Sequence, residues 1–247
     1  MKTKLIAIFL ALLFVTGSTI NGRSLSRRHP QMSKQSFAAG KYGTLAEIFD
    51  ANGKSRFGKL TNNGFQISYE YKGKTTSVSA AATDKVNGLL PGKVTTDGQS
   101  ATVTVTTSDH ALEITTYFVL DEKTQKLIIQ RKFRNISGSP LTLKTVREVI
   151  DPALVETGNI PADKLADKFT ASRPTDDCQA ADCPKGPPPC PIPCPLFAVD
   201  QAQLLAKTNP VTGRPDEIMV QWQDFRSLEQ NNQVSTVVFL ALPPELL

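Results

Sequence analysis

The most constraining feature of this sequence is an alternation of apolar and polar residues that repeats between residues 101 and 150. Within it, Leu112, Ile114 and Phe118 fall on one face of an extended chain, while Glu113 and Tyr117 fall on the other. Because successive side chains of a strand point to opposite faces, this period predicts strands with one buried face. Such runs, separated by turn-rich segments, occupy residues 101–107, 112–120, 126–135 and 141–150. We predict that they form an antiparallel meander, in which each strand pairs with the next.

The same alternation is present earlier in the chain. Phe65, Ile67 and Tyr69 share a face, and Gly73 offers a turn into a second strand through Val78, which predicts a β-hairpin. The preceding stretch GTLAEIFD, residues 43–50, combines a strand-like run with the spacing of a helix capping box. We predict a strand there.

Beyond Asp151 the alternation stops. It returns in EIMVQWQDF and in QVSTVVFLALPP, which we predict to form a final hairpin. Residues 152–215 are therefore predicted as a long Cys- and Pro-rich loop inserted into a single β-domain. One short helix is expected within it, with Pro161 near its start and Leu165 and Phe169 on one side.

The stretch LEITTYFVLDEKTQKLIIQRKFRNISGSPLTLK resembles the large antiparallel β-sandwiches of bacterial exported proteins. These include the supersandwich domains of aldose epimerases and of the non-catalytic parts of some polysaccharide-active enzymes. The resemblance implies an all-β, supersandwich-like antiparallel β-sandwich, and it concerns the fold alone. Epimerases of this kind use histidines after this strand pair, where the present chain has TVREVIDP, which counts against epimerase activity.

The chain begins with a pattern typical of a secretory signal peptide. Lys2 and Lys4 precede an uninterrupted apolar run, and small and polar residues follow it. The run is shorter than the roughly 20 residues that span a bilayer, so we expect cleavage after Gly17 or Gly22 and no transmembrane anchor afterwards. The predicted organisation is a signal peptide at 1–22, a basic disordered leader at 23–40 and one β-sandwich domain at 41–247. The expected location is secreted or periplasmic.

Charge indicates which partners are improbable. Removal of residues 1–22 lowers the formal net charge from +5 to +3, because Lys2 and Lys4 are lost and no acid is. Such a mild excess does not indicate a nucleic-acid partner. The expected partner is instead a polysaccharide or another envelope protein, and no cofactor is expected.

Few catalytic groups stand out. Of the two histidines, His29 lies in the leader and His110 in the turn SDHA, without the motifs of a nucleophilic or zinc hydrolase around them. Glu148 and Asp151 lie at the end of a predicted strand and are weak candidates for a carboxylate pair, because glycoside hydrolysis needs two such groups across a cleft. No catalytic residue is assigned.

Aromatic rings are the other resource, since exposed rings stack on sugar faces. The candidates for ligand binding are Tyr69, Tyr71, Tyr117 and Trp222. Because Trp222 alternates with Ile218 and Val220, a place in the core is the stronger interpretation for it.

The four cysteines, Cys178, Cys183, Cys190 and Cys194, lie within twenty residues of one another among prolines. Their spacing lacks the two-residue knuckle of zinc ribbons, and an exported chain meets an oxidising environment, so we predict disulfides. Polyproline II geometry holds Cys190 and Cys194 about 12 Å apart, beyond disulfide reach. The nested pairing, Cys178 with Cys194, is preferred over the crossed one, Cys178 with Cys190. No metal site is assigned, although Asp176, Asp177 and Asp182 are weak calcium candidates.

The leading hypothesis is an exported, non-enzymatic β-sandwich that binds or scaffolds a component of the cell envelope or exterior. The alternative is a carbohydrate-active enzyme, or its accessory binding domain, that uses the carboxylates at the strand end.

Overall fold

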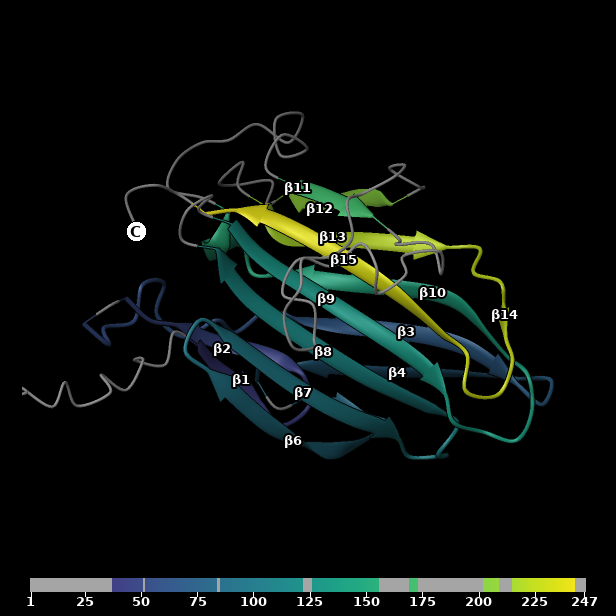
Figure 1. The fold of residues 1–247 in the computed structure, drawn as a ribbon. Helices are drawn as coiled ribbons and strands as arrows, with labels where there is room; N and C mark the ends of the chain where they lie inside the picture. The colour runs from purple at the N-terminus through teal and green to yellow at the C-terminus, as the bar shows by residue number, and fades with distance from the viewer. Residues whose placement is uncertain are drawn as a thin grey trace, which may run out of the picture. The chain divides into compact units, whose positions relative to one another are not determined.

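The structure is a computed structural model that describes residues 37–50, 52–83, 85–121, 126–155, 169–172, 202–208 and 215–242. These residues form an antiparallel β-sandwich (Figure 1), which confirms the predicted fold class. The strands of its seven-stranded sheet, in spatial order, are β12 (Gln203–Thr208), β13 (Pro215–Gln223), β10 (Leu141–Ile150), β3 (Gly64–Tyr71), β4 (Lys74–Ala81) and β5 (Val86–Asn87), with β14 (Ser227–Leu228) beside the start of β10.

The opposite sheet has six strands. In spatial order they are β11 (Phe169–Ser172), β15 (Gln233–Ala241), β9 (Lys126–Asn135), β8 (Leu112–Asp121), β7 (Ser100–Thr107) and β6 (Leu89–Asp97). A separate hairpin, β1 (Phe37–Gly40) with β2 (Thr44–Ile48), contacts β6 and β7, and a short 3-10 helix, η1 (Pro152–Leu154), follows β10.

The predicted alternation decides which side of each strand is buried. In β8 every second residue from Leu112 to Leu120 is buried, and the residues between them are partly exposed. In β3, Phe65, Ile67 and Tyr69 are buried, as predicted. The apolar faces of both sheets join in one hydrophobic core, because each sheet alone would leave one apolar face in water.

The hairpin predicted around Gly73 is confirmed. Lys72 and Gly73 join β3 to β4 with φ angles of 51° and 71°. When both central residues of a two-residue turn have positive φ, the twist of the turn matches the right-handed twist of the two strands that it joins. The strand predicted in residues 43–50 is also confirmed, as β2.

The predicted meander is correct for three strands and wrong for the fourth. β7, β8 and β9 pair in sequence order, but β10 leaves β9 and pairs with β3 and β13 in the other sheet. Asn135, at the end of β9, is fully buried and donates to the carbonyls of Ser139 and Leu228, at 2.9 and 2.7 Å. These bonds hold the chain where it crosses between the sheets. Alternation specifies a buried face, and it does not specify the neighbouring strand.

The predicted final hairpin is wrong for the same reason. β13 pairs with β10 and β12, whereas β15 lies between β9 and β11 in the opposite sheet. The connection between them contributes β14 to the edge of β10. The last two long strands therefore belong to different sheets.

Two boundaries differ from the predictions. The expected leader, 23–40, overlaps the fold, because residues 37–40 form β1 and Phe37 is completely buried. The expected excursion, 152–215, contributes β11 and β12, which extend the two sheets at their edges. Phe169, expected in a helix, is the first residue of β11, and residues 156–168 lie outside the described residues.

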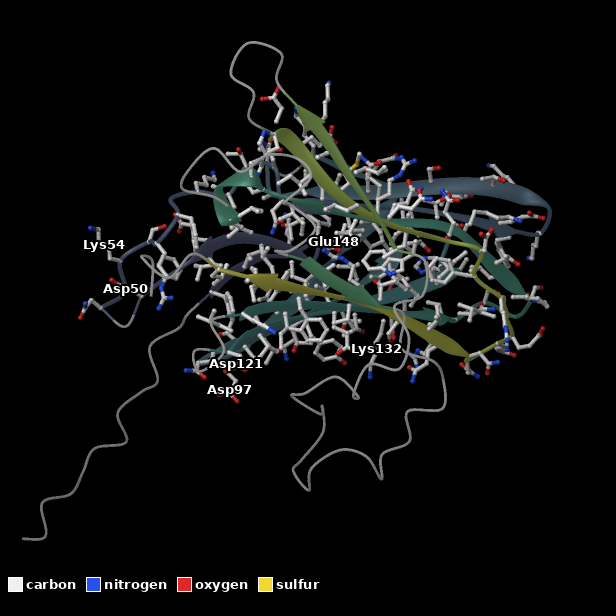
Figure 2. All side chains as sticks on the ribbon, turned by 90° about the horizontal axis from the view of Figure 1, so that it is seen from above. Asp50, Lys54, Asp97, Asp121, Lys132 and Glu148 are labelled. Carbon is white, nitrogen blue, oxygen red and sulfur yellow. The ribbon has the colours of Figure 1, made fainter. Side chains whose placement is uncertain are left out.

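A buried ion pair joins the two sheets. Arg131 of β9 donates from Nε and Nη2 to the two carboxylate oxygens of Glu148 in β10, at 2.6 and 2.7 Å. The side chains are 1% and 2% exposed, and Figure 2 shows Glu148 between the sheets. Burial raises the pKa of Glu148, and the charge and hydrogen bonds of Arg131 oppose that rise.

Arg131 also contacts the turn of the β1–β2 hairpin and the strands β8 and β3. Its Nη1 donates to the carbonyl oxygen of Gly43 at 2.9 Å and to Oγ1 of Thr116 at 2.5 Å. The guanidinium carbon also lies 4.0 Å from the centre of the Phe65 ring. Gly43 has a φ of 77°, and a β-carbon there would lie 2.9 Å from Thr116 Oγ1, so the approach requires glycine.

Candidate functional site

The outward face of the seven-stranded sheet carries a row of polar side chains that crosses its strands. Each member is the register partner of the next, and in β13, β10, β3 and β4 the residues beside them along the strand, such as Glu148 and Val220, are buried. Since side chains alternate between faces, the members of the row point outward. We call this set the polar row: Gln203, Gln221, Arg147, Gln66, Ser79 and Asn87.

The surface on either side of the polar row differs in chemistry. On one side, Thr145, Ser68 and Ser77 form a parallel row of hydroxyl groups. On the other side, Val149, Gly64 and Ala81 are register partners with small or no side chains. A β-carbon at Gly64 would lie 2.2 Å from the carbonyl oxygen of Ala80, so this position requires glycine. No side chain of residue 64 therefore covers the sheet here.

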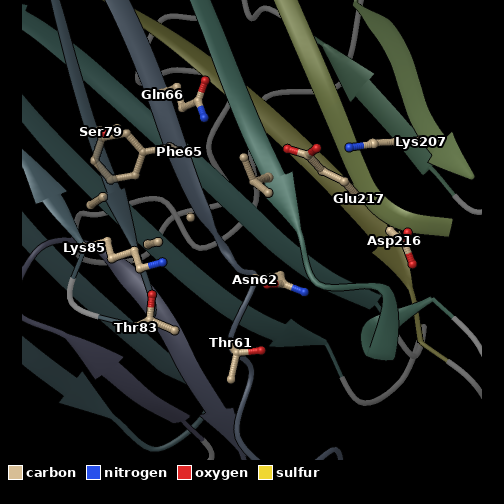
Figure 3. A pocket seen from close by; sticks show the side chains of 14 residues that line it. Thr61, Asn62, Phe65, Gln66, Ser79, Thr83, Lys85, Lys207, Asp216 and Glu217 are labelled. Carbon is tan, nitrogen blue, oxygen red and sulfur yellow. The ribbon is translucent and has the colours of Figure 1, made fainter. Parts of the chain in front are cut away.

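Two open hollows lie on this face, and both are lined by Gln66 and Ser79. The larger hollow, of about 560 Å³, lies over the part of the sheet around Gly64. Figure 3 shows Lys85 on one side of it, with Lys207, Asp216 and Glu217 on the other. The smaller hollow, of about 250 Å³, lies over the polar row and the hydroxyl row. Arg147 lines it, and no carboxylate does.

The side chain of Arg147 is held by a neighbour on the adjacent strand. Its Nε donates to Oε1 of Gln221 at 2.5 Å, and Gln221 is only 4% exposed. Among the described residues, Arg147 forms no salt bridge. The bond to Gln221 therefore orients a guanidinium whose charge has no carboxylate partner in the described part of the chain.

The structure does not place the predicted carboxylates at either hollow. Glu148 is inside the sandwich with Arg131, which corrects the expectation that it projects into a cleft. Asp151 is 7% exposed, and its two oxygens accept from the backbone N–H groups of Ala153, at 3.0 Å, and of Asn62, at 2.9 Å. It caps η1 and ties the start of β3 to the end of β10. Both carboxylates therefore already have structural partners.

The structure does not bring the four aromatic candidates together. Tyr69 and Trp222 are 0% and 1% exposed and belong to the core, which corrects the expectation of rings open to a ligand and agrees with the core interpretation of Trp222. Tyr71 is half-buried at the end of β3, beside Lys72. Tyr117 is half-buried on the outward face of the six-stranded sheet. None of them lines either hollow.

Tyr69 and Asp109 form a hydrogen-bonded pair at one end of the sandwich. The Tyr69 hydroxyl donates to Asp109 at 2.7 Å, and Asp109 also accepts from Thr107 Oγ1, at 2.6 Å, and from the N–H of Ala111, at 3.1 Å. Burial, followed by the bond to Asp109, raises the pKa of Tyr69. Partial burial by itself raises the pKa of Asp109, but its hydrogen bonds outweigh this and lower the pKa.

Tyr69→Phe is expected to destabilise the fold at pH 7 by about 1 kcal/mol, because Asp109 loses one donor. The lowered pKa of Asp109 means that its contribution is present above the unfolded-state pKa, near 3.9, and is lost as the pH falls through the folded-state value. The cost should therefore be smaller at pH 3 than at pH 7 in urea denaturation. Tyr71→Phe, in the same strand, is the control and should cost less at pH 7. An equal cost for both variants at both pH values would contradict the assignment.

The other predicted site residues are apart from this face or beyond the described residues. His110 is exposed in the turn between β7 and β8, with a φ of 55°. Residues 173–201 lie outside the described residues, so the predicted disulfides and calcium candidates stay predictions. The same holds for the signal peptide. In the described part of the chain, no helix is long and apolar enough to cross a membrane.

The residues of the polar row were missed in the sequence. Their only local signal is a polar residue at an outward strand position, which is common to all surface strands. The register that aligns them across strands distant in the sequence is not visible there. No protein-family model matches the chain, and no curated protein matches it.

Proposed function

We propose that the protein is an exported, non-enzymatic β-sandwich that binds a polysaccharide of the cell envelope or exterior along the polar row. The polar row is the observation that carries this proposal. A sugar polymer loses hydrogen bonds to water when it binds, so the binding site has to provide hydrogen bonds that replace them. Amide and hydroxyl side chains both donate and accept, which suits the hydroxyl groups of sugars.

The direction of the polar row favours an extended ligand. Adjacent strands of a sheet lie about 4.8 Å apart, so a chain lying across them meets polar side chains at successive strands, except at β13, where Gln221 is buried. The two hollows lie on either side of this line along β3 and β4, and both are lined by Gln66 and Ser79 of the polar row. A long polymer can enter such an open face without a rearrangement of the sheet.

Binding is favoured over catalysis and over a protein partner. Glycoside hydrolysis needs two carboxylates about 5 to 10 Å apart across a cleft, and both Glu148 and Asp151 are held by other groups. Protein interfaces centre on apolar residues. Among the described residues, the large hydrophobic side chains that are exposed are Leu90 and Leu205, in different sheets.

Binding of the purified full chain to a panel of soluble polysaccharides, measured by affinity electrophoresis, tests the proposal. We expect Gln66→Ile combined with Ser79→Val to weaken binding about tenfold or more, because two hydrogen-bonding side chains are lost. Thr102→Val, on the outward face of the six-stranded sheet, is the matched control and should bind normally. The proposal fails if no polysaccharide binds, or if the control weakens binding as much as the double variant.

Export is part of the same proposal and is checked on the same protein. Protein from the exported fraction should begin after Gly17 or Gly22 by N-terminal sequencing. Non-reducing peptide mapping should join Cys178 to Cys194 and Cys183 to Cys190. An intact N-terminus with four free thiols would contradict both expectations.

A further inference from the structure

We propose that the polar row selects acidic polysaccharides, with Arg147 as the residue that binds their carboxylate groups. This inference rests on the proposed function and names the class of ligand. It starts from the charge of the smaller hollow. Among the described residues that line it, Arg147 is the one charged side chain.

The position of the guanidinium is set before a ligand arrives. Gln221, which is buried, accepts the Nε hydrogen at 2.5 Å, so the side chain has little orientational freedom left to lose. An arginine fork binds a carboxylate through two parallel N–H groups. With Nε bonded to Gln221, the two terminal amino groups of Arg147 provide such a pair.

The surrounding groups fit the rest of a sugar ring. Ser77, Ser79 and Thr145 supply hydroxyl groups, while Gln66 and Asn87 supply amides on the β5 side of Arg147. A single cation in the smaller hollow matches one negative charge at that point of the chain. A polymer with doubly charged phosphate groups would leave part of its charge without a partner there.

The larger hollow has a different charge. Its described lining residues include Lys85 and Lys207 together with Asp216 and Glu217, so the described charges balance. In the described part of the chain, neither lysine forms a salt bridge. The selection for a negative group is therefore assigned to Arg147, and the larger hollow is assigned to neutral parts of the polymer.

The test uses the full chain with polygalacturonate and with its fully methyl-esterified form, which has the same backbone without the charges. We expect calorimetry to show at least about tenfold tighter binding of the acid at low salt, and a smaller difference at high salt. Arg147→Gln should remove the difference, so that the acid binds no more tightly than the ester does to the same variant. Arg147→Lys should retain part of it, because the charge remains while the fork is lost.

Lys132→Gln is the matched control, since it removes one positive charge from the outward face of the six-stranded sheet (Figure 2). It should preserve the preference for the acid. Equal binding of the acid and the ester would overturn the inference and leave the proposed function standing, whereas a panel with no binding polymer would overturn both. Equal losses from Arg147→Gln and Lys132→Gln, or tighter Arg147-dependent binding of dextran sulfate, would reject the assignment of Arg147 to carboxylates.

Discussion

Arg131→Ala is expected to lower the free energy of unfolding by about 3 to 5 kcal/mol. The substitution leaves Glu148, which is 1% exposed, without its bidentate partner. It also removes donors to Gly43 and Thr116. The buried carboxylate of Glu148 has lost its hydration, and in the native protein the charge and hydrogen bonds of Arg131 compensate this loss. Without Arg131 the loss is uncompensated, so the free-energy penalty is larger than the net contribution of the intact pair.

The loss should depend on pH. Burial raises the pKa of Glu148, and without Arg131 nothing among its named contacts opposes that rise. A carboxyl whose pKa is raised in the folded state does not destabilise the protein below its unfolded-state pKa, near 4.3, because it is protonated in both states. As the pH rises through the folded-state pKa, the protein loses stability. Arg131→Ala should therefore cost less at pH 5 than at pH 8.

Two further variants distinguish the effect of breaking the buried ion pair from the effect of removing any arginine side chain. Arg134→Ala, in the same strand, breaks an exposed salt bridge to Glu113 of 2.8 Å and should cost less than about 1 kcal/mol. Arg131→Met combined with Glu148→Leu removes both charges and should cost less than Arg131→Ala. Urea denaturation of all three measures these differences. Similar costs for Arg131→Ala and Arg134→Ala would show that the buried pair does not have the assigned role.

Trp222→Ala is expected to lower the free energy of unfolding by about 3 to 5 kcal/mol, because it opens a large cavity between the sheets. Trp222 is 1% exposed, and its register partner Val146 is fully buried. The core around it includes Ile218 and Val220 from the same strand. A strand held on both sides, by β10 and β12, has little freedom to close such a cavity.

A second variant at Trp222 tests its indole N–H, which is buried and has no hydrogen-bond partner among the described residues. Trp222→Phe removes this unsatisfied donor and keeps an aromatic ring, so it should cost about 1 to 2 kcal/mol. Leu205→Ala, at a position 37% exposed in the adjacent β12, should change stability by about 0.5 kcal/mol or less. Thermal and urea unfolding provide the comparison. A cost below about 1 kcal/mol for Trp222→Ala would contradict its place in the core.

The parts of the fold that were predictable depend on neighbouring residues in the sequence. The bounds 126–135 and 141–150 agree with β9 and β10, and the buried face of β8 is the predicted one. The crossing from β9 to β10 was missed, because it depends on the bonds of Asn135 to Ser139 and Leu228. Residue 228 is far from residue 135 in the sequence, and no local pattern joins them.

The candidate site shows the same division. That Arg147 occupies a strand and points outward follows from the alternation around it. That it lies beside Gln221 and Gln66 follows from the register of β10 with β13 and β3. The opposite error occurred at Glu148, where a polar residue on the inward face was interpreted as a functional carboxylate. Its partner, Arg131, occupies an inward position of β9, and facing inward positions on two strands are the signal that could have identified the pair.

The place of β15 within the six-stranded sheet has a consequence for how the chain folds. β15 lies between β9 and β11, and Gln233 near the C-terminus pairs with Arg134 from the middle of the chain. Contacts so distant in sequence form late and slowly, because a long loop has to close before they can stabilise anything. The ribosome has therefore passed residue 241 before this sheet can be completed. A polypeptide that stays unfolded until then suits transport across a membrane as an extended chain, which the export we propose requires.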